Sequence, residues 1–407
     1  MTSIEMIDDW LDRGTAILKN RDTISKDIET LPPRVFKGQE LAKLLGLSSV
    51  NTVYKAEERG LLNKPDRQSR SQGYVLEEVL ERMDHFNALP WREPEEPPIY
   101  LSVTNFKGGC WKTAIAWNLA TYLANQGYRV LLNDLDPQAT ISDFMGFMPD
   151  YDVGYEDGIG PYLLNDPDFP IERFSETAIH KTRIPTLDII PGCLDLASVE
   201  STLTSELVRY LHAGESEQVM AMYQRVGQVL SHVDRNYDFV ISDGTPSLGV
   251  LPMNLILSSD IALVPIPCEV PDFSSSLRFL EMLKDYIVSF TDNLDITPYL
   301  PQLAFLPTKF NPGKHTKGSE VVLNDIRHTF TDTGLKTVIK RHDSVTHTLN
   351  YVKRTVFEVN PKDVDVPRDA LKKAVMNYSA AFEEILETLI YPRWPSKKAI
   401  LEDMGVY

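Results

Sequence analysis

The chain has 407 residues, of which 43% are hydrophobic and 24% charged, and its formal net charge is −17. This composition fits a globular protein of two or three domains, and the negative charge excludes a protein that coats nucleic acid or an anionic membrane with its whole surface. Three scattered cysteines predict neither a disulfide framework nor a zinc site. The acidic N-terminus and the lack of an apolar run of about 20 residues predict a cytoplasmic protein without membrane contact.

Residues 1–30 are predicted to form an amphipathic helix. Apolar residues recur at helical spacing between charged ones, at Ile7, Trp10, Leu11, Ile17 and Leu18. This apolar stripe needs a partner, which is either the helix's own domain or a second copy of the chain.

Residues 31–88 are predicted to form a winged helix-turn-helix domain that binds DNA. A helix over 39–45 ends at Gly46, a turn follows, and a second helix covers 51–59. A basic loop, a short strand near Tyr74 and a further helix complete a pattern that resembles MerR-like winged helices. A helical pair of this kind also occurs in purely structural roles. The residues expected to contact DNA are Asn51, Thr52, Tyr54, Lys55, Arg67 and Arg70.

Four prolines within residues 89–98 predict a stiff linker to the next domain. From 99 to 390, short runs rich in Val, Ile and Leu alternate with helical stretches. This alternation predicts an α/β fold with a mostly parallel sheet covered by helices on both faces. Residues 391–407 are expected to form a C-terminal tail. The strand-like runs are IYLSVTN, RVLLNDLD, TLDIIPG, DFVISDGTP, IALVPIP and QLAFLPT.

The segment NFKGGCWKTA, residues 105–114, lies between the first of these runs and a helix predicted over 112–125. This is the setting of a phosphate-binding loop, in which the first N–H groups of the helix and its dipole face an anion. Gly108 and Gly109 let the backbone approach phosphate oxygens. Lys112 would contact the β- and γ-phosphates, and the Thr113 hydroxyl would contact Mg²⁺.

Lys107 changes the interpretation of this loop, because an ordinary phosphate loop has no second lysine there. The pattern K-G-G-x-x-K-[ST] resembles the deviant Walker A motif of the ParA/MinD ATPases. The resemblance implies a P-loop NTPase fold, ATP or ADP with Mg²⁺ as ligands, and an ATP-sandwich homodimer in which Lys107 typically reaches the phosphates across the dimer. Most members carry Gly at position 111 and many carry Val at position 110, so this chain departs from them there. The expected nucleotide contacts are Lys107, Gly108, Gly109, Cys110, Trp111, Lys112, Thr113 and Ala114, with Lys107 and Lys112 also catalytic.

Two acidic segments follow the loop, DLDPQ with Asp134 and Asp136, and SDGTP with Asp243. Each comes at the end of a strand-like run, and carboxylates are ligands that suit Mg²⁺. The resemblance implies that Asp136 positions the attacking water as a catalytic residue. It also implies that Asp134 and Asp243, with Thr113, hold the Mg²⁺ shell. The residues expected to close over adenine are Pro307, Thr308 and Lys309.

The motifs and their order resemble those of the long ParA proteins of plasmids and phage-plasmids. That resemblance implies slow ATP hydrolysis stimulated by a ParB-type centromere-binding protein, and nonspecific binding of nucleoid DNA by the ATP dimer. It further implies binding to operator DNA, so that the N-terminal domain represses its own operon. Basic residues expected at DNA are Arg341, Lys353 and Arg354, with Lys372 and Lys373 as weaker candidates; a solvated charged face is the alternative for all of them.

Three other functions are weighed against this one. A transcriptional repressor could use the nucleotide only as a ligand switch, without hydrolysis. A MinD-like membrane-cycling ATPase needs a basic amphipathic helix, which residues 391–407 do not provide. An electron carrier related to nitrogenase reductase needs a cysteine pair for its cluster, whereas Cys110 lies inside the phosphate loop.

Overall fold

The computed structural model describes residues 31–65, 73–247, 249–294, 298–311 and 317–398, together with residues 4, 6, 7, 9–14, 16 and 17. The predicted DNA contacts Arg67 and Arg70 therefore lie outside the described residues. No helix among the described residues is long and apolar enough to cross a membrane.

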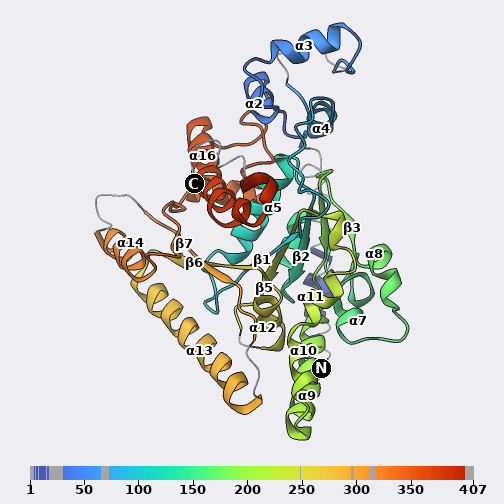
Figure 1. Ribbon diagram of the computed structural model, residues 1–407, viewed down its shortest axis with the longest axis vertical. Coiled ribbons are helices and arrows are strands. Elements are labelled where there is room, and N and C mark those ends of the chain that lie inside the picture. The colour runs from blue at the N-terminus through green and yellow to red at the C-terminus, as the bar shows by residue number, and fades with distance from the viewer. Residues whose placement is uncertain are drawn as a thin grey trace.

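A seven-stranded sheet, counted over the described residues, forms the centre of the molecule in the order β3-β4-β2-β5-β1-β6-β7 (Figure 1). All its pairings are parallel except that of β3 with β4. The six strand-like runs of the sequence contain every strand except β3, so the predicted α/β fold is confirmed. The strands are β1 (Ile99–Val103), β2 (Val130–Leu135), β3 (His180–Lys181), β4 (Leu187–Ile190), β5 (Phe239–Gly244), β6 (Ile261–Pro267) and β7 (Gln302–Thr308).

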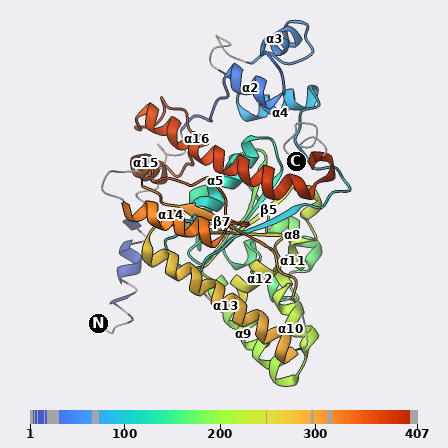
Figure 2. The ribbon, with the colours of Figure 1, turned by 60° about the vertical axis from the view of Figure 1, so that its left-hand side comes forward.

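Helices cover both faces of this sheet (Figures 1 and 2). A π-helical segment, Leu386–Ile390, continues the last α-helix. The α-helices are α2 (Gly38–Leu44), α3 (Asn51–Glu58), α4 (Leu76–His85), α5 (Lys112–Asn125), α6 (Thr140–Met145), α7 (Gly160–Leu163), α8 (Phe174–Thr177), α9 (Leu196–Ala213), α10 (Ser216–Tyr223), α11 (Arg225–Leu230), α12 (Val250–Leu257), α13 (Val270–Leu294), α14 (Lys317–Thr329), α15 (Asp343–Tyr351) and α16 (Arg368–Ile385).

The strands alternate their side chains between two hydrophobic cores, one on each face. In β2, Val130 and Leu132 point into the core that contains α5, α15 and α16. Leu131 and Leu135 point into the core built from α7 to α14. This period of two explains why nearly every residue of the strands is apolar, since both faces are buried.

The N-terminal helical region, residues 31–88, has the predicted helices. Helices α2 and α3 begin and end within one residue of the predicted bounds. The strand predicted near Tyr74 is a single bridge to Phe36, with N–H···O distances of 2.7 and 2.9 Å. Arg82 of α4 and Glu57 of α3, both fully buried, form an ion pair of 2.7 Å that holds these two helices together.

The predicted linker lies against the sheet region instead of spanning open space. The Trp91 indole N–H donates to the Gly127 carbonyl at 2.9 Å, and the Arg92 Nε–H donates to the Tyr237 carbonyl at 3.0 Å. The Trp394 indole N–H donates to the Pro97 carbonyl at 2.9 Å. The linker and the described beginning of the predicted tail are thus attached to the same body, while residues 399–407 lie outside the described residues.

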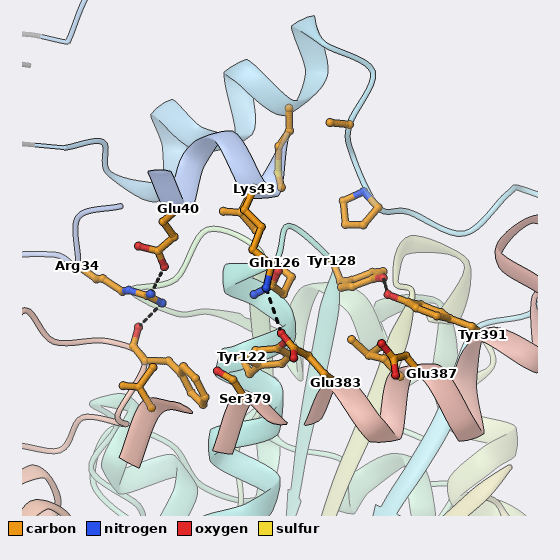
Figure 3. Close-up of a pocket in the computed structure, with 17 residues that line it drawn as sticks. Arg34, Glu40, Lys43, Tyr122, Gln126, Tyr128, Ser379, Glu383, Glu387 and Tyr391 are labelled. Carbon is orange, nitrogen blue, oxygen red and sulfur yellow. Dashed lines mark hydrogen bonds and ion pairs between the residues drawn. The ribbon is translucent and has the colours of Figure 1, made fainter. Parts of the chain in front are cut away.

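A cavity of about 470 Å³ separates the N-terminal helical region from α16 (Figure 3). Lys43 of α2 reaches across it to Glu383 of α16, with 3.5 Å between Nζ and Oε1. Tyr122 and Gln126, at the C-terminal end of α5, form part of the wall. The N-terminal helical region therefore faces the far end of the helix that begins at the phosphate loop.

Candidate active site

The phosphate loop joins the end of β1 to the first residue of α5. Asn105, fully buried, fixes its start: its Oδ1 accepts the Lys107 N–H at 3.0 Å and its Nδ2 donates to the Pro265 carbonyl at 2.9 Å. Gly109 has a φ of +73°, and a Cβ at Gly108 or Gly109 would meet no atom within 4 Å. The space in front of the two glycines is therefore open to a ligand.

Lys112 and Cys110 line the inside of this loop. The Lys112 ammonium donates to the Lys107 carbonyl at 3.4 Å, and the residue is only 6% exposed. The Cys110 thiol donates to the same carbonyl at 3.2 Å, and burial raises its pKa. Cys110 is thus a neutral buried residue, while the carbonyl at position 107 holds the lysine over the loop. Thr113 and Ala114 follow in the first turn of α5, partly exposed.

Trp111 has a left-handed backbone, with φ of 75° and ψ of 22°, directly before α5. Glycine adopts this conformation without strain, whereas another L-residue in it costs about 1–2 kcal/mol. The position therefore favours the glycine of the ordinary loop pattern for its backbone. The half-buried indole packs against the core that contains α5.

Asp243 is a buried carboxylate near the Thr113 hydroxyl and the Lys112 ammonium, each of which acts to lower its pKa. In the described part of the chain neither of its carboxylate oxygens has a hydrogen-bond partner. It lies opposite Asp134 in the pairing of β2 with β5. Burial, and next the charge of Asp134, raise the pKa of Asp243 well above its ordinary range. Since an unpaired buried carboxylate is costly, this pair of acids fits a divalent cation.

Ser142 of α6 holds the other acid of this pair. Its hydroxyl and its backbone N–H both donate to Asp134 Oδ2, at 2.7 and 2.9 Å. The same hydroxyl accepts the Gly192 N–H at 2.8 Å. Burial raises the pKa of Asp134 to about 6. A Cβ on Gly192 would lie 2.9 Å from the carbonyl oxygens of Asp134 and Asp136, so only glycine allows this approach.

Asp136 lies one residue beyond β2 and is partly exposed, unlike Asp134. Its Oδ1 accepts the Gln138 N–H at 2.9 Å, which fixes the carboxylate in the turn after the strand. This position at the mouth of the site agrees with its predicted role, which stays a prediction.

Of the residues predicted at adenine, Pro307 and Thr308 end strand β7 and Lys309 follows it, beside the loop. Pro307 and Thr308 are buried, and Lys309 has a positive φ of 53°. The Lys309 ammonium lies 5.8 Å from the centroid of the Trp111 ring. The structure thus brings this segment to the end of the phosphate loop, and its contact with adenine stays a prediction.

Lys107, predicted to reach the phosphates, has its side chain on a neighbouring helix. Its ammonium lies 3.4 Å from Oδ1 of Asp272, in the first turn of α13. Sequence reasoning missed Asp272 and Ser142 because no spacing rule connects them to the phosphate loop or to DLDPQ.

The predicted DNA contacts are divided between two parts of the molecule. At the start of α3, Asn51, Thr52 and Lys55 are exposed and Tyr54 is partly exposed. Three basic residues of the ATPase region that are predicted at DNA have partners within the chain. Arg341 is paired with Glu269, Lys353 with Asp143 at 2.7 Å, and Arg354 donates to the Lys353 carbonyl at 3.0 Å, while Lys372 and Lys373 are exposed. Their contacts with DNA stay predictions.

Comparison with known proteins identifies the family. Over 361 residues the chain is 31% identical to Protein SopA of Escherichia coli (strain K12), covering 87% of this chain and 88% of the relative. The chain belongs to the ParA/MinD family of P-loop ATPases. The sporulation initiation inhibitor protein Soj of Bacillus subtilis (strain 168) is 28% identical, with 68% of this chain and 98% of Soj covered.

Two further comparisons agree with this family. A protein family described as an AAA domain matches residues 99–296 of the chain, which include the strands β1 to β6 and helix α13. A solved structure described as a partition protein superposes with a TM-score of 0.59, covering 85% of this chain and 99% of that one. Its sequence is 19% identical, so this likeness is one of fold. ATP or ADP with Mg²⁺ are the ligands of the ATPase family. The open space at Gly108 and Gly109 fits the phosphates, and the buried acids Asp134 and Asp243 fit the Mg²⁺ ion.

Proposed function

We propose that the chain is a ParA-type partition ATPase, which segregates plasmid or phage-plasmid DNA together with a ParB-type partner. It binds ATP and Mg²⁺ as a homodimer and hydrolyses ATP slowly until the partner stimulates it. The observation that carries the proposal is the buried carboxylate of Asp243, which lies opposite Asp134 beside an open phosphate loop and whose oxygens accept no hydrogen bond of ordinary geometry from the described residues.

The chain's own residues account for the chemistry. The N–H groups of the loop and the Lys112 ammonium bind the β- and γ-phosphates, and Lys112 stabilises the charge of the transferred phosphoryl group. Asp134 and Asp243, with the Thr113 hydroxyl, hold the Mg²⁺ shell. Mg²⁺, when bound, neutralises phosphate charge. Asp136, at the mouth of the site, orients the attacking water.

DNA binding is assigned to two surfaces. The exposed residues Asn51, Thr52 and Lys55 on α3 support operator binding, and a dimer would read half-sites roughly 34 Å apart. The ATP dimer binds nucleoid DNA through its basic residues, which makes the protein cytoplasmic and nucleoid-associated. Dimerisation is supported by the N-terminal residues Trp10 and Leu11, which are 60% and 61% exposed and helical.

The test is ATP turnover, measured with and without DNA and a ParB-type protein. Lys112→Ala should lose nucleotide binding. Asp136→Ala should still bind ATP. Its rate of hydrolysis should fall by at least about 10²-fold, because the attacking water is no longer positioned. Unchanged turnover in both variants would contradict the assigned chemistry.

A second candidate is a repressor that is switched by nucleotide and hydrolyses little of it. It is favoured by the strained backbone of Trp111 and by the position of α5, whose C-terminal end faces α2 across the cavity. Operator binding that responds to a non-hydrolysable ATP analogue, with no turnover under any condition, would favour this candidate.

A further inference from the structure

The first turn of helix α12, a few residues after strand β5, has two backbone N–H groups without an acceptor in the helix. The Met253 N–H donates to the Gly249 carbonyl at 3.3 Å, and Pro252 has no N–H. The N–H groups of Val250 and Leu251 therefore need an acceptor from outside α12. Gly249, the residue before the helix, has no side chain that could supply one.

Glu200 of α9 supplies this acceptor. Its carboxylate lies directly at Gly249, because a Cβ on that glycine would lie 1.7 Å from Glu200 Oε1 and 2.8 Å from its Cδ. Burial raises the pKa of Glu200, and hydrogen bonds from the N–H groups of Leu251 and Val250 act to lower it. A side chain from another helix thus takes the place of a capping residue next to α12 in the sequence.

The rest of α12 is held without Glu200. All eight residues of the helix are buried. Asn254 Oδ1 accepts the Val226 N–H at 3.1 Å, and its Nδ2 donates to the Met222 carbonyl at 2.8 Å. Loss of the Glu200 carboxylate should therefore free the first turn of α12 and the residues before it, without unfolding the helix.

The chain before α12 comes from the centre of the nucleotide site. Strand β5 lies between β2 and β1, and the three strands are parallel. Because the carboxyl ends of parallel strands meet at one edge of a sheet, residues 245–247 leave that edge between Asp136, after β2, and the phosphate loop, after β1. Asp243 is fixed by strand pairing on both sides, whereas residues 246 and 247 are exposed. Residues 245–247 and Gly249, named the β5–α12 connection, thus depend on the start of α12 for their position.

We infer that Glu200 is a positioning residue for ATP hydrolysis, which acts by fixing the β5–α12 connection next to the attacking water. The inference rests on the proposed function, because it adds a residue to the reaction of that same site. Glu200 lies outside the residues assigned to the phosphates and to Mg²⁺, so its loss should change the rate of hydrolysis more than the affinity for nucleotide. A misplacement of about 1 Å at a reacting centre lowers a rate by about 10²-fold.

The experiment compares the full-length wild type with Glu200→Ala, using a fluorescent ATP analogue with Mg²⁺ for affinity and ATP turnover for kcat. Glu200→Ala should bind the analogue within about twofold of the wild type, and its kcat should fall by about 10- to 10²-fold. Glu200→Gln keeps an oxygen acceptor of the same reach and should keep most of the wild-type kcat. Glu217→Ala removes an exposed acid from the neighbouring helix α10 and should change neither property.

Gly249→Ala tests the same contact from the other side. The backbone of Gly249 is extended, with φ of −159°, so an alanine fits the backbone and only the Glu200 carboxylate has to move away. Gly249→Ala should lower kcat as Glu200→Ala does. The double variant should be no slower than either single variant, because the contact is already lost in each of them.

The outcomes separate this inference from the proposed function. If the wild type hydrolyses ATP, Lys112→Ala does not bind it, and Glu200→Ala keeps the wild-type kcat, the role of Glu200 is overturned and the ATPase stands. Equal losses of kcat in Glu200→Ala and Glu200→Gln, or additive losses in the double variant, also overturn the role of Glu200. If the wild type neither binds nor hydrolyses ATP, both fail.

Thermal unfolding of every variant distinguishes positioning from a structural cap. Lower stability with unchanged kcat would make Glu200 a structural cap only and would overturn the inference. If Glu200→Ala is unfolded, the comparison of Gly249→Ala with Glu200→Gln decides the question, since the first should lose kcat and the second should keep it.

Discussion

The Lys309 ammonium lies 5.8 Å from the centroid of the Trp111 indole, and both residues have positive φ, 53° and 75°. Lys309 follows β7 and Trp111 precedes α5, so the contact joins two segments at the nucleotide site. A cation over an indole contributes about 0.5–1 kcal/mol at a partly exposed site. This contact and the packing of the indole offset the strain of Trp111, which explains how a large side chain occupies a position that favours glycine.

Replacing Trp111 by Gly and by Ala separates the strain from the packing. Both variants lose the indole, but only Ala keeps a Cβ in the left-handed conformation. We expect Trp111→Ala to be less stable than Trp111→Gly by about 1 kcal/mol, measured by urea denaturation without nucleotide. Equal stability would mean that position 111 does not keep its positive φ in solution.

The sequence predicts those features that depend on neighbours along the chain. The runs around β2 and β5, the loop NFKGGCWKTA and the helix after it were predictable because periodicity and loop chemistry are local. The contacts of the site are not local: Asn105 and Ser276 are separated by 171 positions. For the same reason the prolines of 89–98 predicted a stiff segment, but not that Trp91 and Arg92 would attach it to the sheet region.

The buried pair of Arg82 and Glu57 should control the stability of the N-terminal helical region. Arg82→Met leaves the Glu57 carboxylate buried without its cation, which should destabilise the region by about 3–5 kcal/mol. Adding Glu57→Gln should recover part of this loss, because a neutral side chain needs no counterion. Thermal unfolding of the single and double variants checks both statements. A single variant as stable as the wild type would show that the pair is open to solvent.

The pairing of Lys353 with Asp143 makes a prediction about DNA binding. If Lys353 contacts phosphate in the ATP dimer, Asp143→Asn should strengthen nonspecific DNA binding by releasing the lysine. Lys353→Ala should weaken nonspecific DNA binding. It should also make the slope of the logarithm of the binding constant against the logarithm of the salt concentration shallower by about 0.9. Lys181→Ala is the control, since Lys181 is also paired with an acid, Asp188, at 2.8 Å. If Lys181→Ala and Lys353→Ala change DNA binding equally, Lys353 is not a specific part of the DNA-binding surface.

The two buried acids predict how stability depends on pH. Burial raises the pKa of Asp134 to about 6 and that of Asp243 further above its ordinary range, so the folded chain binds protons that the unfolded chain releases. Their contribution to stability is therefore fully present below pH ~4 and is lost as the pH rises through the raised pKa of each acid, which for Asp134 is about 6.

Without ligand, Asp243→Asn should thus gain stability relative to the wild type as the pH rises from 5 to 8. Mg²⁺ with ADP should stabilise the wild type more at pH 8 than at pH 5, because it binds the ionised acids, and should stabilise Asp243→Asn less. Thermal unfolding at both pH values, with and without Mg²⁺ and ADP, measures this. If Mg²⁺ and ADP stabilise the wild type as much at pH 5 as at pH 8, these acids do not bind the metal.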